Sequence, residues 1–491
     1  MNLRGKIRRL IVFVVLVSAI VSVGQAQSSL GFYHLNDQFN VSGFNPAFLS
    51  SQKNFTVSIF PLAGMDLALN NGGVIKDVTT SFFSGNQSVN ELRGVFTSLE
   101  QGLFLVNYES NLLNLGYYSH FGSFNFRIKE NVIMMTDLKG NLSDFLTSSA
   151  FNNLVIGPTQ LFAAEAMHYR EYSLGYGKEI IKNKLTVGVR AKLYFGKSFL
   201  SSEVSGRIIE RSGAVYLQVS GPMRLSIPAN PMIINGNLKD IGISNNFNIG
   251  SYLSNAGNIG TGLDLGIKYE ISPELELSAS VVDLGKINWK KNIHTLIFKD
   301  EFQFSAHQVR LTVDQNGVPI LTKLNSKPLV DTISFKLNVD ESAFSKALPT
   351  YLYFGLKYQL NSKLSFGLVD RYIKLKGLSQ NSISLTPNYE LNKKFVFSIG
   401  YSSIGISHFN VPMAILYKWE GGQSYLGTDN VLSILLPSYK DFSGISFGTC
   451  FFLFNHRSKY KKQLEYLPFY KEKRSRSVTD NGLIFNSYPN S

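Results

Sequence analysis

Histidines, cysteine and acidic residues are the side chains that most often bind metals, and they are common catalytic groups. The seven histidines stand at positions 34, 120, 168, 294, 307, 408 and 456. They show no H-E-x-x-H pair or other metal-ligand spacing, and no phosphate-binding glycine loop accompanies them. Cys450 is the only cysteine, so no disulfide forms within one chain. The sequence therefore predicts a protein that is not an enzyme and that holds no metal and no cofactor.

Charged side chains recur instead at alternate positions of apolar segments. In KLTVGVRAKLYFG (residues 184–196) every odd-numbered position is apolar, and Arg190 and Lys192 stand between them. Successive side chains of a β-strand point to opposite faces, so one face of this strand is apolar and the other carries two cations. The same alternation appears in segments 122–129, 172–177, 263–270, 275–281, 352–358, 395–402, 411–419 and 445–451.

The length of these strands helps to distinguish a transmembrane β-barrel from a soluble β-sandwich. Many runs extend over 9 to 12 residues, whereas soluble strands have about 5 to 6 and a tilted strand needs about 9 to 11 to cross a bilayer. A soluble sandwich also permits alternation. Strand length, aromatic strand ends, an export signal and the lack of intrachain disulfides together favour an antiparallel transmembrane β-barrel. We expect about 14 strands, with 12 or 16 as alternatives.

The N-terminus has the three parts of a secretory signal peptide. Four basic residues precede the apolar run LIVFVVLVSAIVSV, and Gly24-Gln25-Ala26 follows it, which predicts cleavage after Ala26. The alternative is an uncleaved anchor, but the run has 14 residues and a spanning helix needs about 20. Residues 1–26 are therefore predicted to be a signal peptide. The mature protein is expected in the outer membrane of a Gram-negative bacterium, in contact with outer-membrane lipid.

Loop lengths predict the orientation, because outer-membrane barrels have short periplasmic turns and longer external loops. Short turns are expected at 182–183, 272–274, 361–363 and 392–393. With this parity, residues 285–350 form an external insertion in a barrel that extends from 54 to 454. Residues 455–491 form a basic periplasmic tail. The formal charge of +14 lies largely in the signal peptide and this tail, so the barrel needs no nucleic-acid partner.

Five charged residues are predicted to face the lumen: Arg190, Lys192, Asp264, Lys268 and Asp283. Buried charges usually pair, so ion pairs are the favoured interpretation and contact with a polar ligand is the alternative.

Two further features complete the predicted barrel. Trp289 is expected in the external aromatic girdle, where interfacial tryptophans often lie. Glycines at 188, 196, 266, 355, 367, 400 and 448 are expected to mark bends or to give room for a plug.

The tripeptide Asn45-Pro46-Ala47 precedes the first confident strand, and Asn-Pro pairs commonly start turns. Here the sequence resembles outer-membrane transporters of the long-chain fatty-acid (FadL) type and their Bacteroidota relatives. The resemblance implies that an N-P-A segment belongs to a plug inside the barrel, within residues 27–53. This chain continues with Phe48 and Leu49, where family members usually have small residues.

A second resemblance rests on GTGLDLGIKYEISPELELSASVVDLGKINWKKN (residues 260–292) and its flanking segments. They look like an uncharacterised family of exported Bacteroidota barrels within the same group. The likeness implies a plugged outer-membrane barrel that transports a hydrophobic or amphipathic small molecule passively. Similarity to PorV-like barrels implies the alternative, a structural or secretion-accessory barrel that binds exported proteins through its external loops.

Overall fold

A computed structural model of the chain describes sixteen stretches of the sequence. They are residues 30–35, 38–51, 55–70, 103–137, 156–211, 214–227, 229–234, 237–243, 248–304, 309–313, 319–323, 338–340, 342–375, 378–404, 407–435 and 442–453. The predicted signal peptide and the predicted basic tail lie outside the described residues. Within the described residues, no helix is long and apolar enough to cross a membrane.

The fold is a closed antiparallel barrel of 14 strands, as expected for an all-β membrane protein. Around the wall the strands are β1 (Phe55–Ile59) with β2 (Met65–Asn70), β3 (Leu103–Ser119), β4 (Gly122–Asp137), β5 (Ile156–Ile181), β6 (Leu185–Arg211), β10 (Asn258–Glu270), β11 (Leu275–Trp289), β17 (Thr350–Gln359), β18 (Leu364–Leu375), β19 (Leu378–Glu390), β20 (Phe395–Ile399) with β21 (Tyr401–Ile404), β22 (Ser407–Asn410) with β23 (Met413–Trp419), β24 (Gly422–Thr428) and β25 (Phe442–Leu453). Pairing of β25 with β1 and β2 closes the barrel.

The four predicted short turns are confirmed, since each lies between two consecutive wall strands. They connect β5 to β6, β10 to β11, β17 to β18 and β19 to β20. All four lie at one end of the barrel, which we call the short-turn end. Which side of a membrane this end faces stays a prediction.

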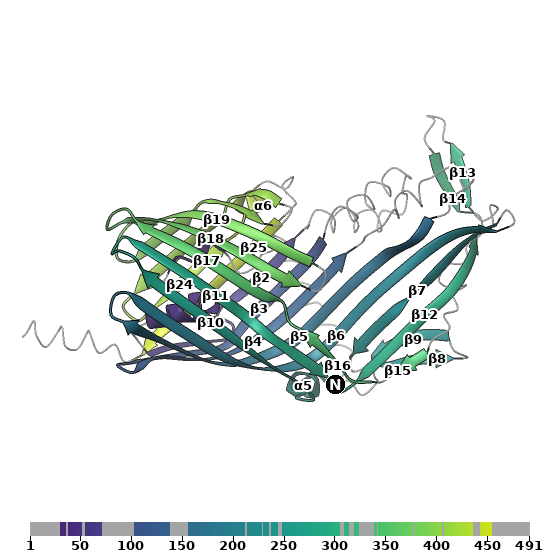
Figure 1. Ribbon diagram of the computed structural model, residues 1–491, viewed down its shortest axis with the longest axis horizontal. Coiled ribbons are helices and arrows are strands. Elements are labelled where there is room, and N and C mark those ends of the chain that lie inside the picture. Colours follow the sequence, from purple (N-terminus) through teal and green to yellow (C-terminus); the bar gives the residue numbers. More distant parts are fainter. Residues whose placement is uncertain are drawn as a thin grey trace, which may run out of the picture.

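One side of the wall extends well beyond the opposite side (Figure 1). Strands β5 and β6 have 26 and 27 residues. The first half of β6 pairs with β10, and its second half pairs with β7 (Ala214–Ser226), which in turn pairs with β12 (Ile293–Phe304). The other elements on this side are β8 (Ala229–Ile234), β9 (Asn237–Ile243), β13 (Val309–Val313), β14 (Pro319–Lys323), β15 (Asn338–Asp340), β16 (Phe344–Ala347) and the helix α5 (Ile249–Ser254); helix α6 (Val431–Leu435) precedes β25.

The two faces of β6 differ as its alternation indicates. Val189 and Leu193 are 38% and 39% exposed on the outer surface, whereas Arg190 and Lys192 are buried inside the barrel. Burying a charge in lipid near the midplane costs about 2 to 4 kcal/mol, which fixes this register strongly. The outer face of the barrel is therefore apolar at this position, and the lumen is charged.

Cysteine labelling tests this register. In a Cys450→Ala background, Val189→Cys and Leu193→Cys should react with a lipid-soluble maleimide in intact membranes, because both positions face outward. Ser173→Cys is the matched control, since Ser173 lies on neighbouring β5 and is buried inside the barrel. Labelling of Ser173→Cys with protection of Val189→Cys would show that the register is shifted by one residue.

A β-bulge in β11 explains one wrong prediction. Asp283 has a φ of +61°, and here two residues of β11 oppose one residue of β10. An extra residue shifts the alternation, so positions beyond it exchange faces. Leu284 therefore points outward, 55% exposed, while Trp289 is fully buried. Trp289 does not lie in an aromatic girdle; it packs inside the barrel.

Residues 30–35 and 38–51 lie inside the barrel, and we call them the inner segment. It contains three short 3-10 helices, η1 (Leu30–Phe32), η2 (Val41–Gly43) and η3 (Pro46–Ser51). Its apolar side chains form two cores with inward-facing residues of the wall. One core contains Phe32, Leu35 and Phe39; the other contains Leu30, Tyr33, Val41 and Phe48. The barrel is therefore packed rather than hollow over this part of its height.

Candidate functional site

Asn45 attaches the inner segment to the barrel wall. Its side-chain amide donates hydrogen bonds of 3.2 Å to the carbonyl oxygens of Ile267 in β10 and Ala279 in β11. The side-chain oxygen Oδ1 of Asn45 accepts a 2.9 Å hydrogen bond from the backbone N–H of Ala47. Pro46 restricts the backbone of both residues, so the turn is rigid before it meets the wall. This arrangement is an anchor between a turn and two strands.

Glycines in the wall make room for the inner segment, as the sequence predicted. A Cβ on Gly266 would lie 2.0 Å from Oδ1 of Asn45, and a Cβ on Gly188 would lie 2.2 Å from the carbonyl carbon of Pro46. Gly355 and Gly367 are equally close to the inner segment. Gly196 belongs elsewhere, since its missing side chain leaves space for the Trp289 ring.

Phe48 and Leu49 follow the anchor and are both completely buried. The Phe48 ring contacts Tyr33 edge to face, with 5.3 Å between the ring centroids. Full burial of such side chains contributes about 1.5 to 3 kcal/mol each. The positions where this chain departs from the small residues of its apparent relatives are thus filled by apolar packing.

Lys192 is the centre of a buried ionic layer that lies next to the inner segment. Its ammonium group is 2.6 Å from Asp283, 2.9 Å from Asp264 and 3.6 Å from Glu171. The left-handed backbone at the bulge brings Asp283 into this cluster, and the Asp283 N–H donates to the Asp264 carboxylate at 2.8 Å. Three carboxylates from three strands therefore share one lysine.

Neighbouring strands extend the ionic layer. Arg127 lies 3.1 Å from Glu171, and Lys129 lies 2.8 Å from Glu109 and 3.9 Å from Glu171. These groups come from β3, β4 and β5. The segment GSFNFRIK contains Arg127 and Lys129 at alternate positions, so the pattern that revealed Arg190 also marks them. They are site residues that sequence reasoning did not select.

Arg190 joins the ionic layer to the inner segment. Its guanidinium donates to the carbonyl oxygen and the hydroxyl of Ser42, at 2.7 and 3.2 Å. The same group lies 3.6 Å from Asp264. Of the five predicted lumen charges, the structure brings together Arg190, Lys192, Asp264 and Asp283. Lys268 lies apart, 2.8 Å from Glu270 near the short-turn end.

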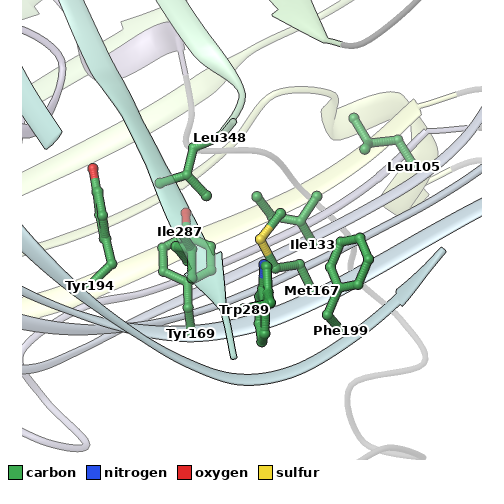
Figure 2. Close-up of a cluster of buried hydrophobic side chains, with 9 residues drawn as sticks. All are labelled: Leu105, Ile133, Met167, Tyr169, Tyr194, Phe199, Ile287, Trp289 and Leu348. Atoms are coloured by element: carbon green, nitrogen blue, oxygen red, sulfur yellow. The ribbon is translucent and has the colours of Figure 1, made fainter. Parts of the chain in front are cut away.

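An apolar layer lines the lumen on the other side of the ionic layer (Figure 2). On β6 the order is Gly188 against the inner segment, then Arg190 and Lys192, then Tyr194. The apolar layer contains Leu105, Ile133, Met167, Tyr169, Tyr194, Phe199, Ile287, Trp289 and Leu348. Along this side of the barrel the apolar layer, the ionic layer and the inner segment therefore follow one another.

A small cavity of about 50 Å³ lies between the inner segment and the ionic layer. Its aromatic lining consists of Phe32, Phe44, Tyr351, Tyr353 and Tyr425. Its charged lining consists of Asp66, Glu109, Arg127, Lys129, Lys192 and Asp283. A cavity with apolar and charged surfaces fits a molecule that has both kinds of surface.

The spacing G-x-S-x-G occurs at Gly444–Gly448, but this segment belongs to the strand β25 rather than to a strand-turn-helix elbow. Ser446 is buried, and its hydroxyl interacts with the carboxylate of Asp66. No group of three or more His, Cys, Asp or Glu side chains among the described residues has the arrangement of a metal site.

Comparisons with known proteins give one family and several distant structures. Residues 46–429 match the model of DUF5723, a family of unknown function. No curated protein matches the chain.

Three solved structures illustrate the distant likeness. The toluene transporter TodX of Pseudomonas putida is 11% identical with a TM-score of 0.35, over 87% of this chain and 94% of that one. The toluene transporter TbuX of Ralstonia pickettii is 11% identical with a TM-score of 0.35, over 85% and 98%. A FadL homologue of Pseudomonas aeruginosa is 10% identical with a TM-score of 0.37, over 87% and 95%.

Proposed function

We propose that this chain, which belongs to the DUF5723 family, is an outer-membrane barrel of a Gram-negative bacterium that conducts a small amphipathic molecule passively. The observation that carries the proposal is the cavity between the inner segment and the ionic layer, with aromatic rings and charges in its lining. The inner segment acts as a plug, and no catalytic step is involved. An apolar outer face in contact with lipid is typical of such barrels.

The arrangement of side chains in the lumen favours an amphipathic molecule, rather than a hydrocarbon, as the transported molecule. A purely apolar molecule would have to pass Lys192 and its three carboxylates without replacing any of their interactions. Desolvation without compensation is unfavourable for such groups. An amphipathic molecule places its chain against Tyr353 and Phe44 and its polar end against the ionic layer.

Uptake into proteoliposomes tests this function. Vesicles that contain the wild-type protein should accumulate an uncharged dodecyl-chain fluorophore faster than empty vesicles. Val282→Phe should slow this uptake sharply, because Val282 lines the cavity and the larger ring occupies part of it. Val189→Phe is the matched control, since the same substitution there points to the outer surface. Equal uptake by empty vesicles, wild-type protein and Val282→Phe would contradict transport through this cavity.

One observation favours the alternative role as a structural or secretion-accessory barrel. Strands β5 and β6 have 26 and 27 residues, more than twice the about 9 to 11 that a membrane crossing requires. With β7 and β12 they build a wall beyond the barrel that is able to present a binding surface to an exported protein (Figure 1). Absence of uptake together with normal membrane insertion would favour this role.

A further inference from the structure

The cavity contains a carboxylate that no lysine, arginine or histidine of the described residues neutralises. Asp66 of β2 lies directly opposite Glu109 of β3, and both line the cavity. Like charges at directly opposed positions of two strands repel each other. Around this cavity every described ion pair uses Glu109, Glu171, Asp264 or Asp283. Asp66 takes part in none of them.

The nearby cations are already engaged. Lys129 acts electrostatically on Asp66, but its ammonium group lies between Glu109 at 2.8 Å and Glu171 at 3.9 Å. Asp429 adds further negative charge around Asp66. The hydroxyl of Ser446 interacts with the Asp66 carboxylate, and Lys129 is the nearby cation that acts on it while it is paired with Glu109 and Glu171. Asp66 therefore has no cation of its own among the described residues around the cavity.

An unused hydrogen-bond acceptor lies on the same lining. Asn111 is 4% exposed, and its side-chain carbonyl oxygen has no partner. The Asn111 N–H donates to the carbonyl oxygen of Gly64 at 2.9 Å, so this backbone contact fixes Asn111 close to the start of β2. A buried acceptor without a donor costs about 1 to 3 kcal/mol, which a ligand N–H group would recover.

Aromatic rings complete the lining around these two groups. Phe32 contacts Tyr425 edge to face at 4.9 Å between centroids, and Phe44 lies 5.8 Å from Tyr353. All four rings line the cavity. The faces of aromatic rings attract cations, and tyrosine and phenylalanine rings are used for this purpose in sites for organic ammonium groups.

We propose that this cavity binds the ammonium group of an amine-bearing amphiphile. Asp66 is its counter-ion, the Asn111 carbonyl oxygen accepts one of its N–H groups, and the aromatic rings contact its alkyl chain. The inference rests on the proposed conduction of an amphipathic molecule and specifies the charge of that molecule. An anionic head group is disfavoured, because Lys129 and Lys192 are already bound to two and three carboxylates.

Equilibrium binding to the full chain in lipid nanodiscs tests the proposal without any transport step. The probes are dodecylamine, dodecanoate and dodecanol, which share one chain and differ in head-group charge. Dodecylamine should bind at least tenfold more tightly than the other two. Asp66→Asn should weaken dodecylamine binding about tenfold and leave dodecanol binding unchanged. Glu276→Gln is the matched control, because Glu276 lies on β11 near Lys268 and outside the cavity lining.

Asn111→Leu is a second variant, because it removes the carbonyl oxygen that accepts a hydrogen bond and leaves the carboxylate of Asp66 in place. It should weaken dodecylamine binding and should not weaken the binding of dodecyltrimethylammonium, which has no N–H group. Tighter binding of dodecanoate than of dodecylamine, or an unchanged amine affinity in Asp66→Asn, would overturn the proposal. If dodecylamine binding depends on Asp66 but the proteoliposomes show no uptake, the amine-binding site is supported and the transport function is rejected.

Discussion

Gly266→Ala is expected to release the inner segment and to open the barrel to ions. A Cβ at this position would lie 2.0 Å from Oδ1 of Asn45, a distance that real Cβ atoms do not adopt. Asn45 then loses both hydrogen bonds to the wall. Two such bonds contribute about 1 kcal/mol each. The fraction of molecules in which the inner segment has left the wall should therefore rise roughly thirtyfold. Single-channel conductance in planar bilayers measures the change.

Two controls separate release from damage to the barrel. Gly421→Ala should behave as the wild type, because its new Cβ would meet the Trp419 ring at 3.5 and 3.7 Å, which are ordinary contact distances away from the inner segment. Asn45→Ala removes the two hydrogen bonds without a clash and should open the channel less often than Gly266→Ala. Deleting residues 42–49 should give a permanently conducting barrel. Wild-type conductance in all three opening variants, with normal insertion, would show that the inner segment is not a gate.

Alternation alone was sufficient to predict which face of each regular strand is buried. Arg190 and Lys192 were assigned to the lumen from their positions between apolar residues, and the structure buries both. Because side chains alternate with a period of two residues, the apolar face fixes which residues point to the opposite face. The closed barrel needed more than this pattern, which a soluble sandwich also permits; strand length, aromatic strand ends, the export signal and the lack of intrachain disulfides favoured it. The short turns were equally readable, because polar residues interrupt the alternation where hairpins form.

Sequence reasoning failed where a single residue breaks the alternation. Trp289 was expected in an external girdle because interfacial tryptophans often lie there, but the bulge at Asp283 reverses the faces of the residues that follow it. Aspartate tolerates a positive φ better than most residues, yet nothing in the sequence marks this position as a bulge. The Trp289 ring consequently belongs to the apolar layer of the lumen.

The partners of the lumen charges depend on strand order and register, which alternation does not specify. Lys192 meets Asp264 because β6 pairs with β10, and it meets Glu171 because β6 also pairs with β5. Asn45 was selected from a resemblance, and its partners are backbone carbonyl oxygens of Ile267 and Ala279, which carry no signature in the sequence.

Lys192→Met is expected to cause the largest loss of stability among single substitutions of the ionic layer. Lys192 bridges three carboxylates, and its side chain is 1% exposed. Removing one member of a buried ion pair costs about 3 to 5 kcal/mol, because the remaining charge is left desolvated and uncompensated. Here Asp283 loses its 2.6 Å ion-pair partner, and Asp264 keeps the Asp283 N–H at 2.8 Å and Arg190 at 3.6 Å. The free energy of unfolding, measured by urea titration of the refolded barrel in micelles, should fall by about this amount.

Two further variants determine whether the loss arises from uncompensated charge. Lys268→Met should cost less, because Lys268 lies near the short-turn end and its partner Glu270 is 31% exposed and remains hydrated. Adding Asp283→Asn to Lys192→Met should recover part of the lost stability, since one of the unpaired charges disappears with the lysine. Recovery in this double variant requires the two losses to be non-additive, as expected for residues in direct contact. Strict additivity would mean that Lys192 stabilises the barrel through packing of its alkyl chain, and the ionic layer would then have no electrostatic role in folding.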